Sequence, residues 1–299
     1  MRGLFNSFSD CLAEARPAVL AITLLRYLVG VLLAAGAGPV LPARIALGAV
    51  GIAAAAFAVY VFNGVTDRRE DIANGSRRPI ASGRLPVRFA ATAAAGAAVA
   101  SALCGLVLGL GDLAVILAYL AVGYAYSGRP FRFKNAFGTV MPSVVVLGLA
   151  AYFGGALAAG GHPGTKLVVF AGANALWMAL VGGISKDLSD VPGDRVAGRR
   201  SLPILLGLGR ARLALCAAAG TVALCFALAA ARLAGELAGC AVVMLLGAAA
   251  VAVTCGYVRE GATRSRCRLP YRAFMWTQHA CHLALLCTIG VAALAYAAA

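Results

Sequence analysis

The chain has 299 residues, of which 62% are hydrophobic and 12% are charged, and its formal net charge is +15. An ordinary soluble domain has about 25% charged residues. The composition therefore excludes a water-soluble globular protein, and it also excludes collagen-like, disordered and disulfide-scaffold proteins. We expect an integral membrane protein, in which an excess of Lys and Arg is typical of cytoplasmic loops rather than of nucleic-acid binding.

Nine apolar stretches are candidates for membrane-spanning helices, which need about 20 mostly apolar residues. They are 18–37, 43–62, 89–110, 112–126, 137–159, 167–186, 211–231, 236–257 and 277–297. Many are rich in Ala and Gly, which lets helices pack closely in lipid. The sequence thus predicts an all-α integral membrane protein of nine transmembrane helices, forming one domain over residues 1–299.

The basic residues predict how the helices are oriented. Of the 26 Lys and Arg, 22 lie at the N-terminus or in loops after even-numbered helices, and three lie in the opposite loops. Lys and Arg accumulate in cytoplasmic loops. We therefore expect a multi-pass protein of the cell membrane with a cytoplasmic N-terminus and an external C-terminus.

The acidic residues gather in two short stretches of the same predicted membrane face. Six of the eleven follow the second or the sixth predicted helix: Asp67, Glu70, Asp71, Asp187, Asp190 and Asp194. Salt bridges to the abundant Arg would explain single acids but not this clustering. The clusters therefore indicate a site.

In the first cluster, Asn63, Asp67 and Asp71 are spaced i, i+4 and i+8. On a helix continuing from the second span, these residues share one face. Two carboxylates and an amide oxygen suit Mg²⁺, which prefers hard oxygen ligands and completes its shell with water and substrate phosphates. Glu70 lies off this face, and we expect it to pair with an Arg.

In the second cluster, Asp187, Asp190 and Asp194 also have helical spacing, but Pro192-Gly193 predicts a helix end and a turn. Both motif loops, near 63–88 and 186–212, continue into an Arg-Arg pair and a Pro-Ile pair. This weak internal repeat predicts two half-sites over a central cavity, an arrangement that transporters also use.

Two acidic sites surrounded by Arg indicate a polyanionic substrate, and a diphosphate fits. Mg²⁺ would bridge its oxygens to Asp, while Arg and Lys neutralise the remaining charge. The loop between the fourth and fifth spans, Tyr126 to Lys134, is basic and carries hydroxyl groups. Because the nearby spans would hold an apolar tail, the predicted substrate is a prenyl diphosphate.

These motifs resemble the UbiA family of intramembrane prenyltransferases. The resemblance covers nearly the whole chain, and it includes Arg16-Pro17 before the first helix. It implies a Mg²⁺-dependent reaction in which diphosphate leaves, an allylic cation forms and an acceptor captures it. One departure is Gly64, where many members carry Asp; the spaced triad is unaffected.

The candidate residues fall into two groups. Four carboxylates are expected to be both catalytic and metal ligands: Asp67, Asp71, Asp190 and Asp194. Two further metal ligands are expected: Asn63 and Asp187. The expected substrate contacts are Tyr126, Lys134, Arg78, Arg200 and Arg26. In contrast, three Arg in a loop without an acid cluster are expected to act only as topology signals: Arg264, Arg266 and Arg268.

Arg26 is the one basic residue in the interior of a predicted span, since the others that fall within the predicted ranges lie at the ends. It lies about 12 Å into the first helix at 1.5 Å per residue. Ionisable residues at such depth are functional candidates by default, and snorkelling along the helix is the alternative.

The sequence thus predicts a Mg²⁺-dependent prenyltransferase that transfers a prenyl group to an acceptor, expected to be aromatic, such as a phenol or a quinone precursor. Within the family, the alternatives are a terpene cyclase and transfer to a glycerol-phosphate acceptor. Outside it, the alternative is a transporter or binding protein for a phosphorylated lipid. The expected partners are these substrates and the lipid bilayer, without nucleic acid.

The orientation predicts the outcome of cysteine-accessibility labelling on intact cells. In a background lacking the native Cys, Ser82→Cys should resist a membrane-impermeant reagent, because its loop faces the cytoplasm, whereas His162→Cys should react. The opposite pattern would place the acidic motifs outside the cell and contradict the orientation.

Overall fold

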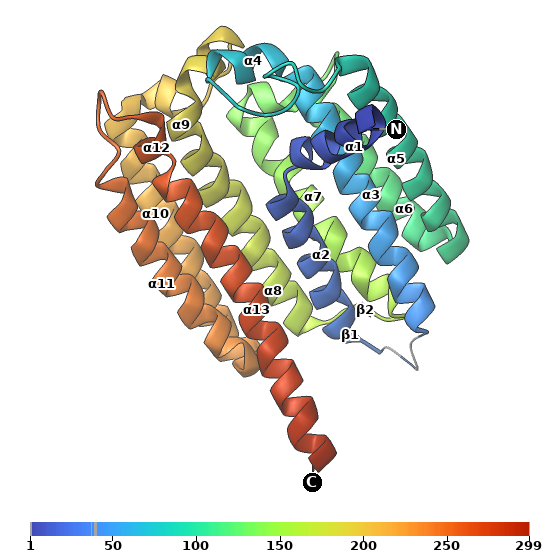
Figure 1. Ribbon diagram of the computed structural model, residues 1–299. Helices are drawn as coiled ribbons and strands as arrows, with labels where there is room; N and C mark the ends of the chain where they lie inside the picture. Colours follow the sequence, from blue (N-terminus) through green and yellow to red (C-terminus); the bar gives the residue numbers. More distant parts are fainter. Residues whose placement is uncertain (1, 37, 39–40, 299) are drawn as a thin grey trace.

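The computed structural model describes residues 2–36, 38 and 41–298, and it is a bundle of long helices (Figure 1). The long helices are α2 (Pro17–Leu32), α3 (Pro42–Thr66), α5 (Val87–Leu108), α6 (Leu110–Ser127), α7 (Phe137–Ala158), α8 (Thr165–Leu176), α9 (Gly183–Val196), α10 (Leu202–Leu233), α11 (Ala238–Cys255) and α13 (Leu269–Ala298). The remaining elements are α1 (Arg2–Glu14), α4 (Arg68–Ala73), α12 (Arg264–Cys267), η1 (Phe133–Asn135), η2 (Trp177–Gly182), η3 (Gly235–Leu237), β1 (Ala34–Ala35) and β2 (His162–Pro163). The predicted all-α class is confirmed.

Within the described residues, seven helical stretches are long and apolar enough to cross a membrane. The 16-residue α2 qualifies only together with α1, from which it is bent by 65°. The predicted span 18–37 ends on residue 37, outside the described residues. The predicted span 277–297 falls on α13, whose side chains are described as far as residue 289. Membrane-spanning character is thus confirmed, and the total of nine spans stays a prediction.

Local sequence explains where several helices begin and end. Proline stands in the first turn of α2, α3 and α10, where its fixed φ suits a helix and its missing N–H is not needed. α5 and α6 are joined by Gly109 alone, whose φ of +128° is open to glycine but strained for other residues. The chain therefore reverses between two spans within one residue.

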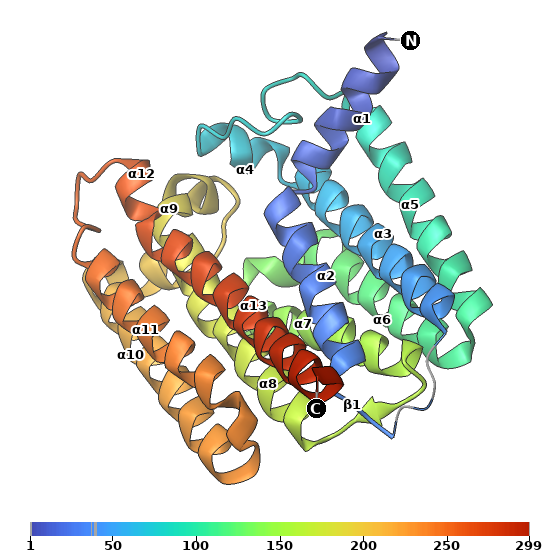
Figure 2. The same cartoon turned by 60° about the horizontal axis from the view of Figure 1, so that its bottom comes forward.

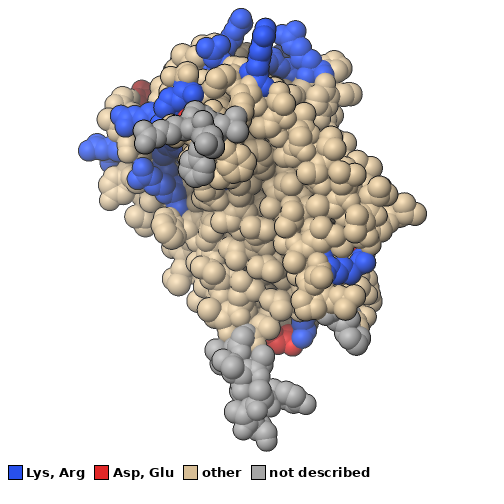
Figure 3. All heavy atoms as spheres, turned by 45° about the vertical axis from the view of Figure 1, so that its right-hand side comes forward, with Lys and Arg blue, Asp and Glu red and all other residues tan. Residues whose placement is uncertain are grey.

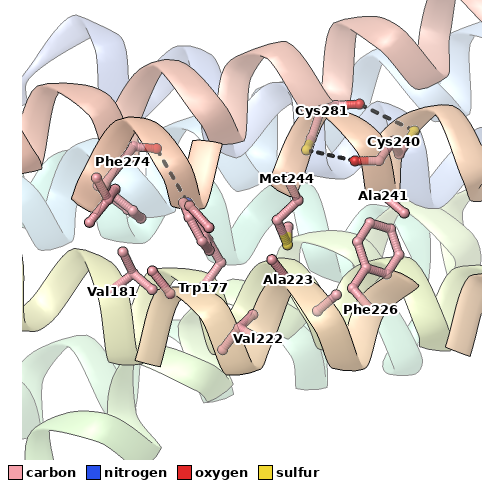
Figure 4. Packing of buried hydrophobic residues seen from close by; sticks show 14 of the residues in the cluster. Trp177, Val181, Val222, Ala223, Phe226, Cys240, Ala241, Met244, Phe274 and Cys281 are labelled. Atoms are coloured by element: carbon pink, nitrogen blue, oxygen red, sulfur yellow. Dashed lines mark hydrogen bonds between the residues drawn. The ribbon is translucent and has the colours of Figure 1, made fainter. Parts of the chain in front are cut away.

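The helices form two main cores with a shared wall between them, and a third, smaller core packs α1 and α5 against α3. Residues of α8, η2, α9, α10, α11 and α13 make the larger core, which contains Trp177 and Phe274 (Figure 4). Residues of α2, α3 and α6 make the second core with one face of α7, while Tyr152 on another face of α7 belongs to the larger core. Figure 2 shows α2 and α7 between the two halves. This leaves room for a cavity where the halves meet.

The two ends of the bundle differ in charge. α4, α9 and α12 lie at one end, and β1 and β2 pair at the other, with Ala34 opposite Pro163 (Figure 1). On the face drawn in Figure 3, Lys and Arg gather at the α4 end, and a broad uncharged band follows below it. The two acidic motifs therefore lie at the same, basic end of the bundle. The cytoplasmic location of that end stays a prediction.

A pair of glycines sets the spacing of α2 and α7. A Cβ at Gly30 would collide with the carbonyl oxygen of Tyr152, and a Cβ at Gly155 with that of Tyr27. Small residues allow such backbone contact between helices in lipid. Since α2 and α7 both line the cavity described below, this contact fixes its width.

We expect Gly155→Val to destabilise the protein strongly. The obstacle is backbone, which cannot move aside like a side chain, so the cost should exceed the roughly 1–3 kcal/mol typical of overpacking. The measurement is thermal unfolding in detergent, with Gly96→Val as the control because a Cβ at Gly96 meets no atom within 4 Å. Equal melting temperatures for the two variants would contradict this account of the helix contact.

Candidate active site

A cavity lies between the two main cores and opens at the α4 end. It encloses about 1270 Å³, counting its open mouth. Its mouth is polar and carries Arg16, Asn63, Asp67, Tyr126, Lys134, Lys186, Asp187, Asp194, Arg199, Arg200 and Ser201. Its inner walls are mainly apolar and include Ile22, Val59, Val144, Leu147, Met178, Ala179 and Phe274. The cavity thus joins a charged mouth to an apolar interior.

The first acidic motif reaches the mouth at the end of α3. Asn63 lies in the last turn of α3 and donates from Nδ2 to Ser127 Oγ at 2.7 Å. Asp67 follows the helix directly, and its carboxylate accepts from Lys134 Nζ and, at 3.2 Å, from Arg199 Nη2. Lys134 also donates to Thr66 at 3.1 Å. Asn63, Asp67 and Lys134 therefore meet where the sequence predicts.

Asp71 and Arg78 depart from the prediction. α3 ends at Thr66 and α4 begins at Arg68, so no continuous helix extends the face of Asn63 and Asp67 to Asp71. Neither Asp71 nor Arg78 lines the cavity. Arg78 instead bridges Asp71 and the buried Glu14, each at 2.7 Å. This pair fastens the loop after α4 to α1, so Asp71 as a metal ligand and Arg78 as a substrate contact are not supported by this geometry.

The second acidic motif lies on a helix that continues further than the sequence indicates. α9 runs through Pro192 to Val196, in place of the predicted turn. Pro192 has no N–H to offer its helix, and the N–H of Gly193 donates to Asn74 Oδ1 at 2.8 Å. A side chain at Gly193 would lie 2.7 Å from the carbonyl oxygen of Glu70. α9 and the α4 segment thus pack closely, which brings the two motifs together.

The three carboxylates of the second motif have different surroundings. Asp187 and Asp194 line the cavity, whereas Asp190 does not. Asp190 is held by Arg264 at 3.0 Å and Lys186 at 3.7 Å. Helical spacing does not separate the three, because residues 187, 190 and 194 share one face; what distinguishes Asp190 is its pairing with Arg264, which comes from a distant segment. Arg264, which was expected to act only as a topology signal, thus also forms a salt bridge with an acidic motif.

Arg199 joins the two motifs, and the sequence reasoning missed it. Its guanidinium contacts Asp67 at 3.2 Å, Asp194 at 3.3 Å, and Glu70. The expected pairing of Glu70 with an Arg is thereby confirmed. The Arg199-Arg200 pair in the sequence pointed to this position, but the sequence analysis names only Arg200 of the pair as a substrate contact. Arg200 lines the cavity too, and its backbone N–H donates to Asn135 at 3.0 Å, tying this segment to the Lys134 loop.

Electrostatics at the mouth favour a charged Asp67. Burial acts to raise the pKa of Asp67, but the Lys134 and Arg199 charges outweigh it and hold that pKa well below its usual range. Burial, followed by the hydrogen bond and charge of Asp67, raises the pKa of Glu70 to about 7. Glu70 is therefore partly protonated at neutral pH, which limits the negative charge that the mouth holds without a ligand.

The residues present fit a divalent cation of the Mg²⁺ kind. Hard oxygen donors come from Asn63, Asp67, Asp187 and Asp194 around one mouth, and Asp194 Oδ2 is buried without a hydrogen-bond partner. In the described part of the chain, no three His, Cys, Asp or Glu side chains are already gathered as a metal site. Lys134 and Arg199 neutralise the carboxylates in this structure, so a metal would arrive with a ligand that engages those cations.

The other predicted substrate contacts also lie at the cavity. Tyr126 and the buried Lys134 line its mouth, and Arg26 lines its interior. Arg16, which the sequence offered only as part of the family resemblance, lines the mouth as well.

Arg199→Gln should lower the free energy of unfolding by roughly 3–5 kcal/mol, the cost of leaving buried carboxylates without their partner. The measurement is chemical or thermal unfolding without Mg²⁺ or substrate. Arg195→Gln is the control, because Arg195 is exposed. If Arg199→Gln unfolds like the control, Arg199 does not hold the two motifs together.

Comparison with known proteins identifies the family to which this chain belongs. Residues 23–278 match the UbiA prenyltransferase family. The bacteriochlorophyll synthase 33 kDa chain of Cereibacter sphaeroides is 34% identical over 153 residues, and that match covers 48% of this chain and 48% of the relative. Digeranylgeranylglyceryl phosphate synthase of Methanopyrus kandleri is 33% identical over 199 residues, covering 65% of this chain and 69% of the relative.

The solved structures agree in fold. A UbiA homolog from Archaeoglobus fulgidus, bound to GPP and Mg²⁺, aligns with a TM-score of 0.67 over 91% of this chain and 99% of that chain, at 19% identity. An apo UbiA homolog from Aeropyrum pernix K1 aligns with a TM-score of 0.63 over 91% of this chain and 97% of that chain, at 22% identity. Since the family match extends over most of the sequence and the helical bundle is shared, this chain belongs to the UbiA prenyltransferase family.

Proposed function

We propose that this protein is a Mg²⁺-dependent intramembrane prenyltransferase that moves a prenyl group from its diphosphate to an acceptor. The observation that carries the proposal is the cavity, whose mouth gathers both acidic motifs with Lys134 and Arg199 and whose interior is mainly apolar. A prenyl diphosphate has a polyanionic head and an apolar tail, and the two parts of the cavity match them. The structure of the Archaeoglobus fulgidus homolog bound to GPP and Mg²⁺ adds support.

Each group at the mouth has a distinct task. Asn63, Asp67, Asp187 and Asp194 would hold Mg²⁺, which supplies positive charge to the diphosphate oxygens as the bond to carbon breaks. Lys134 and Arg199 turn from the carboxylates towards the phosphate oxygens, since charge-assisted hydrogen bonds to phosphate are strong. Arg200 and Tyr126 lie at the same mouth and contact the head from its other sides.

The reaction breaks the bond between C1 of the prenyl group and the diphosphate oxygen, and the electron pair leaves with diphosphate. The allylic cation then accepts an electron pair from the nucleophilic atom of the acceptor, which loses a proton. The apolar walls formed by Ile22, Val144 and Leu147 keep water from the cation. The residues of the mouth thus drive departure of the head, and the residues of the interior protect the intermediate.

The names of the two relatives denote different products, so membership of the family does not by itself define the acceptor. Our expectation from the sequence is an aromatic acceptor, and the alternatives are a glycerol-phosphate acceptor, cyclisation and transport. Incubation with prenyl diphosphate and Mg²⁺ in the absence of an acceptor separates the classes. A cyclised hydrocarbon or alcohol identifies a cyclase, whereas prenyl diphosphate that stays intact with every acceptor offered identifies a transporter or binding protein. We place the reaction at the cytoplasmic face of the cell membrane.

Asp67→Asn and Asp194→Asn should each lower turnover by orders of magnitude. Each change removes a carboxylate that would hold Mg²⁺, and the positive charge of that ion on the leaving diphosphate is worth several kcal/mol in the transition state. The measurement is diphosphate release at saturating Mg²⁺ from folded, purified protein. Glu260→Gln is the control, because Glu260 is exposed in the loop before α12. Near-normal rates from either folded Asp variant would refute the assignment of the metal site.

A further inference from the structure

Arg26 occupies an unusual position in the cavity. It lies on α2, ten residues beyond Arg16 at the mouth, which corresponds to about 15 Å along the helix. Only 4% of its surface is exposed, and it lines the cavity. A cation therefore stands deep inside an apolar chamber, far from the groups proposed to bind diphosphate.

This cation has no counter-charge in the described part of the chain. Nη2 of Arg26 donates to Gln278 Oε1 at 2.8 Å and lies 3.0 Å from Met178 Sδ, while Nε is buried without a partner. The contrast is Arg44, which pairs with Asp112 at 2.9 Å. Burying a charge without a partner costs several kcal/mol, so stability alone does not account for Arg26.

The surroundings hold the guanidinium in place. Gln278 is 2% exposed, and its Nε2 contacts Met275 Sδ at 3.1 Å. One turn later on α13, His282 contacts the backbone oxygen of Gln278 at 2.6 Å and the hydroxyl of Tyr152 at 2.6 Å. Met178 is placed by η2, a π-helical turn, and such turns are frequent at functional sites. Arg26 is therefore a fixed donor rather than a side chain that snorkels to the surface.

We propose that Arg26, together with Gln278, binds an anionic oxygen group of the acceptor, either a carboxylate or a phosphate. The proposal rests on the proposed function and names the class of acceptor. With its anionic end at Arg26, the acceptor presents its other end towards the mouth, where C1 of the prenyl group is released. The anion also neutralises a cation that would otherwise repel the allylic intermediate. For the same reason, an uncompensated guanidinium in the chamber disfavours cyclisation of a hydrocarbon cation.

The first test measures binding without turnover, so it does not depend on catalysis. The probes are two matched pairs: 4-hydroxybenzoate against 4-hydroxybenzamide, and a glycerol-phosphate ether lipid against its uncharged alcohol. The wild-type protein should bind one of the acids at least tenfold more tightly than its neutral partner, and the pair that responds identifies carboxylate or phosphate. Arg26→Gln should abolish that preference, a loss of about 10- to 100-fold, and Arg26→Lys should retain part of it. Arg232→Gln, an exposed residue, should change nothing.

The affinity of the Arg26→Gln variant for a non-reactive prenyl diphosphate analogue with Mg²⁺ should stay within about threefold of wild type. An Arg26→Gln variant that loses the diphosphate analogue but retains the preference for the acid would overturn the proposal. So would a wild-type protein without preference in either pair. Failure of the proposed function looks different, because the preference for an anion would persist while no diphosphate is released with any acceptor.

A second measurement needs no ligand. Arg26→Met removes an uncompensated buried charge, so the melting temperature of this variant should be a few °C above that of wild type. Binding sites commonly reduce the stability of a protein in this way in exchange for function. A fall in melting temperature would mean that Arg26 serves packing, and it would overturn the proposal.

Discussion

The contact of Arg199 with both acidic motifs is the interaction on which the site depends. One guanidinium reaches Asp67 and Glu70 at the end of α3 and in α4, and Asp194 on α9. These segments are more than 100 residues apart in the chain. Without a cation between them, buried carboxylates of like charge would repel one another. The same charges that hold the mouth together are available for diphosphate and metal, so the stability of the site and its proposed chemistry depend on the same groups.

The rest of the fold supports that mouth and keeps the chamber behind it open. Backbone contact of α2 with α7 at Gly30 and Gly155 fixes one wall, and the hydrogen bond between Gly193 and Asn74 joins α9 to the segment after α4. Because each half of the bundle has its own core, the space between them need not be filled by side chains. An isolated cation such as Arg26 can therefore remain in that space. It lowers the stability of the fold, and we propose that it is retained because it binds substrate.

Much of this could be read from the sequence, and the errors have physical reasons. Apolar length and clustered acids predict the helices, the motifs and the end of the bundle where they meet, since these depend on local composition. The roles assigned to Asp71 and Arg78 assumed that the helix of Asn63 continues to Asp71, and the role assigned to Asp190 did not include its pairing with Arg264. The helix that contains Asn63 ends at Thr66, whereas α9 continues through Pro192, next to which the Gly193 N–H donates to Asn74. The role of Arg199 depends on contacts between distant segments, which residue spacing does not contain.

The central claim is that the two motifs act as one diphosphate site, and a double-mutant cycle tests it most directly. The measurement is the affinity of a non-reactive prenyl diphosphate analogue in Mg²⁺ for wild type, Asp67→Asn, Asp194→Asn and the double variant. Groups that share one ligand are coupled, whereas independent sites are additive within about 0.5 kcal/mol. The account predicts that the double variant loses clearly less affinity than the sum of the two single losses. Additive losses would show that the motifs bind separately and would contradict it.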